Sequence, residues 1–91
     1  MKPNSNIHET FCKRLKHARL AKGFSQKSLG IAAGIDEFVA STRINRYEKG
    51  IHEADLDTIQ RLAAALEVHV AYLFADDEAL AAMINQHPLN N

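Results

Sequence analysis

Four polar side chains between residues 41 and 46 have the chemistry needed to contact the edges of nucleobases. Arg46 can form two hydrogen bonds with guanine, Asn45 can do the same with adenine, and the methyl group of Thr42 can contact thymine. Ser41 adds a short hydroxyl group beside them. We therefore treat these four residues as candidate base-contacting residues, with an ordinary solvated surface as the alternative interpretation.

Basic and amide side chains nearby suit the phosphate groups of a nucleic acid. Lys27, Arg43 and Lys49 are expected to set affinity rather than sequence preference, because a phosphate contact carries no base information. Gln26 can hydrogen-bond to a phosphate or to a neighbouring base edge. If Ser25 opens a helix, the free N–H groups of its first turn favour the same kind of ligand.

The charges are distributed unevenly, although the 91-residue chain has a formal net charge of zero. Residues 1–50 hold ten Lys and Arg residues and four Asp and Glu residues, whereas residues 51–91 hold one basic and seven acidic residues. The two parts therefore carry charges of +6 and −6. This asymmetry indicates one surface for a polyanion and another that stays away from it.

Helices must position these side chains, because the composition favours helix over sheet: Trp is absent, Gly occurs four times and Pro twice. Apolar residues at helical spacing predict an all-α fold, a compact bundle of five to six short helices. We expect residues 1–7 to form a flexible leader, 8–87 a single domain and 88–91 a tail. The predicted helices cover 8–22, 26–33, 35–49, 56–66 and 68–74, with a sixth that runs through Ile84, and the candidate N-caps are Ser25, Asp36, Asp55 and Asp76 or Asp77.

The order of several short motifs resembles the Cro/phage-repressor (XRE) family over roughly residues 8–74. The combination consists of Gly-Phe-Ser-Gln at 23–26, Arg-Tyr-Glu-Lys-Gly at 46–50, and Leu15, Arg19, Leu29, Gly34-Ile35, Ile44, Leu56, Leu62-Ala63 and Leu66. The resemblance implies a lambda repressor-like helix-turn-helix domain. In that family the second helix lies across the DNA backbone and the third lies in the major groove.

This resemblance also implies a function. It implies sequence-specific binding of double-stranded DNA by a transcriptional regulator, with repression by promoter occlusion and a homodimer as the expected mode. Arg19 and Glu48 resemble a family pair that ties the first helix to the end of the third, and a buried pair of this kind would hold the third helix at its angle.

Three further interpretations concern partners. The candidates for a dimer interface are apolar residues near the C-terminus, with ordinary core packing as the alternative: Tyr72, Leu73, Phe74, Leu80, Met83 and Ile84. One rival function is an antitoxin whose acidic C-terminal part binds a toxin partner. The other is a protein-interaction module that keeps the fold without binding DNA.

The chain departs from the family pattern between its second and third helices. Gly34 and Gly50 are 16 positions apart, about four more than is usual in the family, which is close to one helical turn. We favour a third helix that is longer at its start, with Asp36 as its cap. Residues 37–39 would then be candidate groove residues. The alternative is an enlarged turn over 36–40, with Ser41 as the cap.

A second departure is Gly30, where the family usually has Ala. Gly inside a helix costs about 1 kcal/mol relative to Ala. We expect this cost to be tolerated because the third helix packs closely against the second at this position.

Several other functions are not expected. No apolar run reaches the roughly 18 residues of a membrane span, and residues 1–6 lack the apolar core of a signal peptide, so we expect a cytoplasmic protein with no membrane partner. The five His residues and Cys12 never stand at metal-ligand spacing, so we expect no metal and no cofactor. Cys12 is expected to be a packed thiol, and no acid–base pair indicates an enzyme.

Overall fold

Side chains that cap helix ends set the boundaries of most helices. Asn6 Oδ1 accepts hydrogen bonds from two backbone N–H groups at the start of the first helix. Ser25, Asp55 and Asp77 cap three later helices in the same manner. The computed structural model describes residues 6–89, and its helices over that range are α1 (Ile7–Lys22), α2 (Gln26–Ala32), α3 (Ala40–Glu48), α4 (Leu56–Leu66), α5 (Val70–Leu73) and α6 (Glu78–Gln86).

The described residues form six helices and no strand, so the all-α prediction is confirmed. α1 begins at Ile7, which is the last residue of the predicted leader, and Asp77 rather than Asp76 caps α6. Residues 1–5 and 90–91, which belong to the predicted leader and tail, lie outside the described residues.

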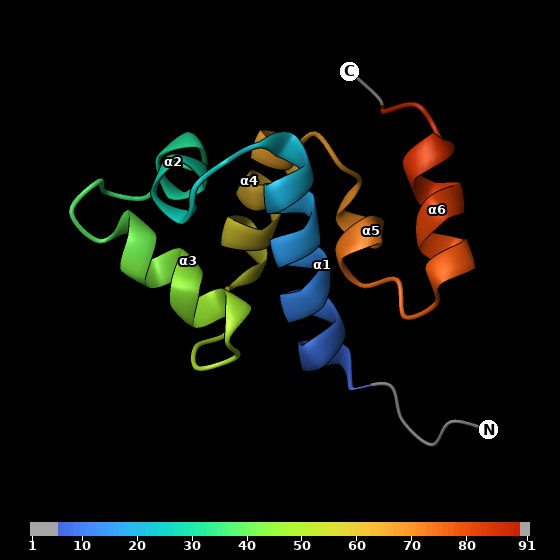
Figure 1. Cartoon of the computed structure of the whole chain (residues 1–91), viewed down its shortest axis with the longest axis horizontal. Coiled ribbons are helices and arrows are strands. Elements are labelled where there is room, and N and C mark those ends of the chain that lie inside the picture. The colour runs from blue at the N-terminus through green and yellow to red at the C-terminus, as the bar shows by residue number, and fades with distance from the viewer. Residues whose placement is uncertain (1–5, 90–91) are drawn as a thin grey trace.

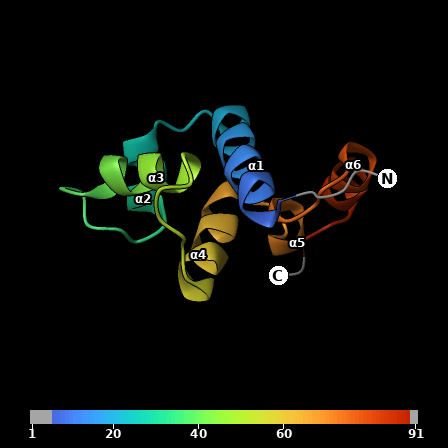
Figure 2. The same ribbon diagram turned by 90° about the horizontal axis from the view of Figure 1, so that it is seen from below.

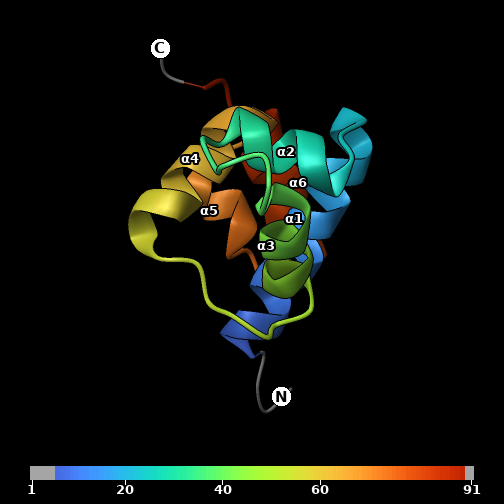
Figure 3. The same cartoon turned by 90° about the vertical axis from the view of Figure 1, so that its left-hand side faces the viewer.

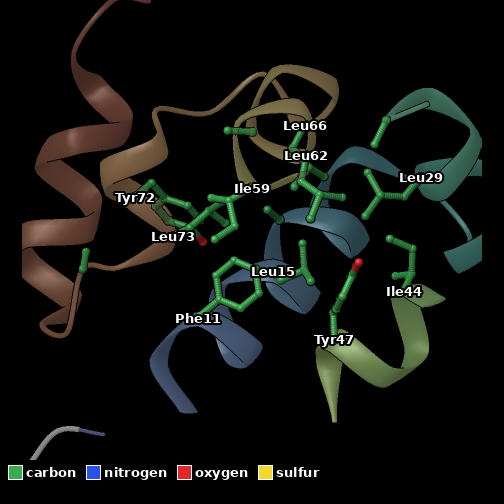
Figure 4. Close-up of a cluster of buried hydrophobic side chains, with 14 of the residues drawn as sticks. Phe11, Leu15, Leu29, Ile44, Tyr47, Ile59, Leu62, Leu66, Tyr72 and Leu73 are labelled. Atoms are coloured by element: carbon green, nitrogen blue, oxygen red, sulfur yellow. The ribbon is translucent and has the colours of Figure 1, made fainter. Parts of the chain in front are cut away.

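Each helix from α1 to α5 contributes one large, fully buried side chain to a common core. Figure 4 shows these side chains together, and in chain order they are Leu15, Leu29, Ile44, Leu62 and Leu73. Phe11 stacks on Phe74, with ring centroids 5.6 Å apart, and extends the core along α1. Because protein interiors are closely packed, this shared core fixes α2 and α3 relative to α1 and α4.

The α2–α3 pair and α6 lie at opposite ends of the molecule. In Figures 1 and 2, α1 lies between them. The attachment of α6 is slight, since Ala81 is its only buried residue. The buried Arg14 of α1 connects it further: its Nε donates to the carbonyl of Ala75 at 2.9 Å and its Nη1 donates to Glu78 at 3.0 Å.

The C-terminal apolar residues divide between the core and the surface. Tyr72 and Leu73 are buried in the core, so this part of the predicted dimer interface is wrong, because neither side chain is accessible to a second copy. Phe74 and Ile84 are half-buried against the core. Of the six candidates, Leu80 and Met83 remain exposed on α6.

The third helix is shorter than the favoured prediction. α3 begins at Ala40, and residues 37–39 form a turn, so the prediction of a helix from Asp36 is wrong and the alternative of an enlarged turn is right in outline. Asp36 stabilises the turn instead: its Oδ1 accepts a hydrogen bond from the N–H of Phe38 at 2.8 Å, and its carbonyl accepts one from the N–H of Val39 at 3.0 Å. Val39 holds the N-cap position without a side-chain hydrogen bond, so the predicted cap at Ser41 is also wrong.

The start of α3 instead packs closely against α2. A Cβ atom built on Gly30 would lie 2.6 Å from the Cβ atom of Ala40 and 3.0 Å from its Cα atom. Cβ atoms do not approach one another so closely, so only Gly fits at this position. The expectation that Gly30 reflects close packing of the third helix is confirmed. A tertiary contact therefore fixes the first turn of α3.

Candidate nucleic-acid interface

α3 has one face in the core and one face in solvent. Its inner face consists of Ala40, Ile44 and Tyr47, which recur at helical spacing and are buried. In Figure 3, α3 lies at the front of the molecule, with α2 above it. The predicted contact residues of α3 and its C-cap all reach the surface: Ser41, Thr42, Arg43, Arg46 and Lys49 are exposed, and Asn45 is half-buried.

Part of this exposed face borders a groove of about 400 Å³. Thr42, Arg43 and Arg46 line it from α3, and His52 and Glu53 line it from the connection to α4. Nothing in the sequence marked these two loop residues, because single polar residues in a loop have no periodicity. The groove is therefore basic on the α3 side and acidic on the loop side, where the Glu53 carboxylate would repel a phosphate.

A buried ion pair joins α1 to the end of α3. Arg19 Nε lies 2.6 Å from Glu48 Oε2, and Arg19 Nη2 lies 3.2 Å from Glu48 Oε1. The two side chains are 10% and 4% exposed. Arg19 Nη1 also donates to the carbonyl of Phe24 at 3.1 Å, in the turn between α1 and α2. The predicted pair is therefore present, and its geometry is bidentate, which is the strongest arrangement for such a pair.

Gln26 belongs to the same network. Its Nε2 donates to Glu48 Oε1 at 3.1 Å, which ties the start of α2 to the end of α3. The sequence predicts a phosphate or base contact for Gln26, but in the structure one end of its amide is already used. Ser25 and Ser28 cap each other's backbone N–H groups. In the first turn of α2, helix geometry therefore leaves the N–H groups of Gln26 and Lys27 for an anion.

Ion pairs within the chain neutralise part of the charge asymmetry. Lys22 pairs with Glu67, and Lys13 and Arg14 pair with Glu78. Hydrogen bonds from these cations hold the pKa of both carboxyl groups below the ordinary value. Three basic residues of the first half are thus occupied by acids of the second. No ion-pair partner within residues 6–89 occupies the cations of the predicted interface, which are Lys27, Arg43, Arg46 and Lys49.

Cys12 lies beside the end of α3 and is half-buried. Its Sγ donates a hydrogen bond to the carbonyl of Tyr47 at 3.2 Å. Burial raises the pKa of the Cys12 thiol above its ordinary value, so the thiolate is disfavoured. Among residues 6–89 no three His, Cys, Asp or Glu side chains come together to hold a metal ion. Over the same residues, no helix has the length and apolar character to cross a membrane.

This geometry defines the class of protein: a helix-turn-helix domain whose third helix, α3, has a basic exposed face. The helix-turn-helix family model matches residues 15–73, which include α2, α3 and α4. The chain therefore belongs to the helix-turn-helix family of transcriptional regulators, as its resemblance to the XRE family indicates. The relatives reported below are named as transcriptional regulators.

Individual relatives support this assignment. Two HTH-type transcriptional regulators of Sinorhizobium fredii, y4aM and y4wC, are 34% and 31% identical to the chain over 64 and 75 residues. These matches cover 70% and 82% of this chain, but only 42% and 49% of the relatives, so the chain spans less than half of their length. The crystal structure of the transcriptional regulator BswR is similar to the fold described above, with a TM-score of 0.78 and 44% identity over 82% of this chain and 74% of that chain.

Proposed function

We propose that the chain binds a short double-stranded DNA site through α3 in the major groove and represses transcription by occluding a promoter. The observation that carries the proposal is the division of α3 into two faces. Burial of Ile44 and Tyr47 turns Thr42 and Arg46 outward, and Arg46 has no ion-pair partner among residues 6–89. The major groove admits an α-helix, and a cationic helix face suits the negative charge of DNA.

The exposed side chains divide into two roles. Arg46 would pair with guanine, Asn45 with adenine, and the Thr42 methyl group would contact thymine, with Ser41 at the edge of the same face. Phosphate contacts would come from Lys27, Arg43 and Lys49 and from the N–H groups of the first turn of α2. The first group sets the preferred sequence, and the second sets affinity for any duplex.

The buried hydrogen bonds of Arg19, Gln26 and Glu48 fix the distance between the base-contacting and the phosphate-contacting side chains. Glu48 receives hydrogen bonds from Arg19 in α1 and from Gln26 in α2, while it belongs to α3 itself. A DNA backbone contact at the start of α2 and a groove contact on α3 can therefore form at the same time. We assign Arg19, Glu48 and Gln26 a positioning role.

We further propose that the protein acts as a homodimer on a two-fold DNA site in the cytoplasm. Two copies on neighbouring half-sites would be separated by about one helical turn of DNA, roughly 34 Å. Leu80 and Met83 are the predicted interface residues that remain exposed in the structure. They lie on α6, at the opposite end of the molecule from α3 (Figure 1).

The first experiment is a titration of a duplex at several salt concentrations. Each released counterion contributes about 0.9 to the slope of log affinity against log salt concentration. Three phosphate-contacting cations predict a slope of about −3 for each bound chain, by the same rule. This is a smaller slope than the charge of +6 suggests, because Lys13, Arg14 and Lys22 are occupied within the chain. A flat response would contradict DNA binding.

The second experiment separates the two roles. A consensus site is first selected from random duplex DNA. Arg46→Ala should then lose about 1–3 kcal/mol at that site and relax the preference at one base position. Lys49→Ala should weaken binding to the consensus and to random duplexes alike, and should reduce the salt slope by about one. An equal loss for both kinds of duplex in Arg46→Ala would contradict the assignment of Arg46 to a base.

A further inference from the structure

The enlarged turn before α3 exposes a large aromatic side chain. Phe38 is 89% exposed, more than any other large apolar side chain among residues 6–89. Burial of a Phe side chain stabilises a fold, and the fold forgoes this stabilisation at Phe38. The neighbouring Val39 is also exposed. The turn therefore presents an apolar tip that nothing within the described chain covers.

The turn holds this tip in a defined place. Ile35 packs against the core on one side of it, and Ala40 is fully buried on the other. Between these two anchors, the hydrogen bond from the N–H of Phe38 to Asp36 Oδ1 closes the turn. The contact of Ala40 with Gly30 prevents the end of the turn from moving toward α2. The backbone that carries Phe38 is thus preorganised.

The turn lies on the side of the molecule that bears α3. In Figure 1 it forms the left-hand edge of the molecule, and in Figure 3, where that edge faces the viewer, it passes in front of α2 and enters α3. Val39 lines the same groove as Thr42 and Arg46. Phe38 therefore stands next to the proposed base-contacting face, at the N-terminal end of the helix that would enter the DNA.

We propose that Phe38 contacts the methyl group of a thymine in the major groove and so adds a base preference that α3 alone does not give. The inference rests on the proposed function. Its chemical basis is that the thymine methyl is the one apolar group that base pairs present in the major groove. An apolar side chain at the entrance of that groove has this group as its matching ligand.

The charges of the turn fit this assignment better than a phosphate contact. Glu37 is an exposed carboxylate, and a carboxylate beside a phosphate is repelled. The Asp36 carboxylate accepts the N–H of Phe38. A turn with two acids and two apolar residues is therefore suited to base edges and unsuited to the DNA backbone.

The test replaces the thymines of the selected consensus site by uracil, one at a time, so that only the methyl group is lost. Wild-type protein should lose about fourfold in affinity at each contacted thymine, which is the effect of one buried methyl-sized group. In each half-site one such thymine is assigned to Thr42 and another to Phe38. Phe38→Ala should bind the unmodified site about fourfold more weakly and should lose nothing further from uracil at that position. Phe38→Leu, which keeps an apolar contact, should retain part of the uracil effect.

Two variants serve as controls. Val70→Ala removes an exposed apolar side chain of α5, outside the proposed DNA-contacting face and the proposed dimer interface, and it should keep the wild-type response to uracil. Glu37→Gln removes the carboxylate beside Phe38, and it should raise the affinity for the consensus and for random duplexes alike if the turn lies close to DNA. Phe38→Ala should unfold at the wild-type temperature, because its side chain is exposed.

The outcomes distinguish this inference from the proposed function. If wild-type protein binds the consensus but Phe38→Ala shows the same uracil response, the contact with thymine is wrong and the function stands. The same conclusion follows if Glu37→Gln leaves every affinity unchanged, or if Phe38→Ala changes only the self-association of the free protein. If wild-type protein selects no sequence at all, the proposed function itself is contradicted.

Discussion

The two ends of the molecule are held by different kinds of contact. At one end, α2 and α3 bury Leu29 and Ile44 completely and touch at Gly30. The Glu48 carboxylate of α3 also accepts hydrogen bonds from Arg19 and Gln26. At the other end, α6 buries only Ala81, and its charged contact with α1 uses Glu78, a carboxylate whose side chain is 72% exposed. The first end is therefore fixed by contacts that are desolvated on both sides, whereas the ion pair at the second end joins a buried Arg14 to an exposed carboxylate that water can reach.

This difference indicates how the two ends would behave in solution. Elements with few buried contacts open at a lower free energy than the core of a protein does. The helix pair proposed to read DNA is the rigid end, and a rigid end loses little entropy when it binds. The helix that carries the exposed Leu80 and Met83 is the adjustable end. The predictions below test this contrast, beginning with the largest effect.

The largest effect is expected from loss of the buried ion pair. Arg19→Ala leaves the Glu48 carboxylate buried without its cation, which should lower the free energy of unfolding by about 3 kcal/mol or more. Glu48→Ala should cost a similar amount for the converse reason, and the double variant should recover part of the loss. Chemical denaturation measures all three.

The matched control for that prediction is an exposed pair. Asp57 and Arg61 are four positions apart on α4, and both side chains are largely exposed. Arg61→Ala should change the free energy of unfolding by about 0.5 kcal/mol or less. If Arg19→Ala is as mild as Arg61→Ala, the α3 end does not depend on the buried pair and the contrast between the two ends fails.

The next effect concerns the contact between α2 and α3. Ala is the better helix former by about 1 kcal/mol, so Gly30→Ala should stabilise α2 if nothing opposes it. A Cβ atom would clash with Ala40, however, and overpacking of this kind typically costs about 1–3 kcal/mol. We expect a net loss of unfolding free energy together with weaker binding to the consensus DNA, because α3 must move. Ala32→Gly, at an exposed site on the same helix, provides the control for helix propensity alone. A stabilised Gly30→Ala variant would show that α3 can move at little cost.

The smallest effect is expected at the adjustable end. Glu78→Gln removes the carboxylate that pairs with Lys13 and Arg14, and it should speed hydrogen exchange of the α6 amides more than that of the α3 amides. Its effect on global stability should be smaller than that of either preceding change. Exchange that accelerates equally in α3 and α6 would mean that the two ends open as one unit.

Acidification of the wild-type protein should reproduce the effect of Glu78→Gln on α6. Hydrogen bonds from Arg14 and Lys13 lower the pKa of Glu78 in the folded state, so the carboxylate stabilises the fold. This stabilisation is complete above the ordinary glutamate pKa of about 4.3 and is lost as the pH falls through the lower pKa of the folded state. The protection factors of the α6 amides against hydrogen exchange should therefore fall below roughly pH 4. The Glu78→Gln variant should show no such step. An identical acid response in both proteins would contradict this role.

The sequence predicted the features that depend on local chemistry. Ser25 and Asp55 occupy N-cap positions because a short polar side chain beside an apolar helical pattern is sufficient to open a helix. Ile44 and Tyr47 were recognisable as the inner face of α3 from their spacing. The pair of Arg19 and Glu48 came from the family resemblance, since 29 positions separate the two residues and no local pattern connects them.

The start of α3 could not be predicted in the same way. Four extra residues add about one turn, so a lengthened helix keeps the same faces as a shorter one. The choice depends on the contact of Gly30 with Ala40 and on the turn that Asp36 closes, which are tertiary and conformational facts. For the same reason, the use of Gln26 in the buried network was outside the reach of sequence patterns.

The most direct test of the central claim is a titration of isotope-labelled protein with the selected duplex, followed through the backbone amide chemical shifts. If the outward face of α3 enters the major groove and the start of α2 contacts the backbone, the largest changes should occur at Lys27, Thr42 and Arg46. The chemical shifts of the α6 amides should change less than those of Lys27, Thr42 and Arg46, even if two copies of the protein contact each other on the DNA. Largest changes at Leu80 and Met83, with the amides of α3 unmoved, would contradict the account.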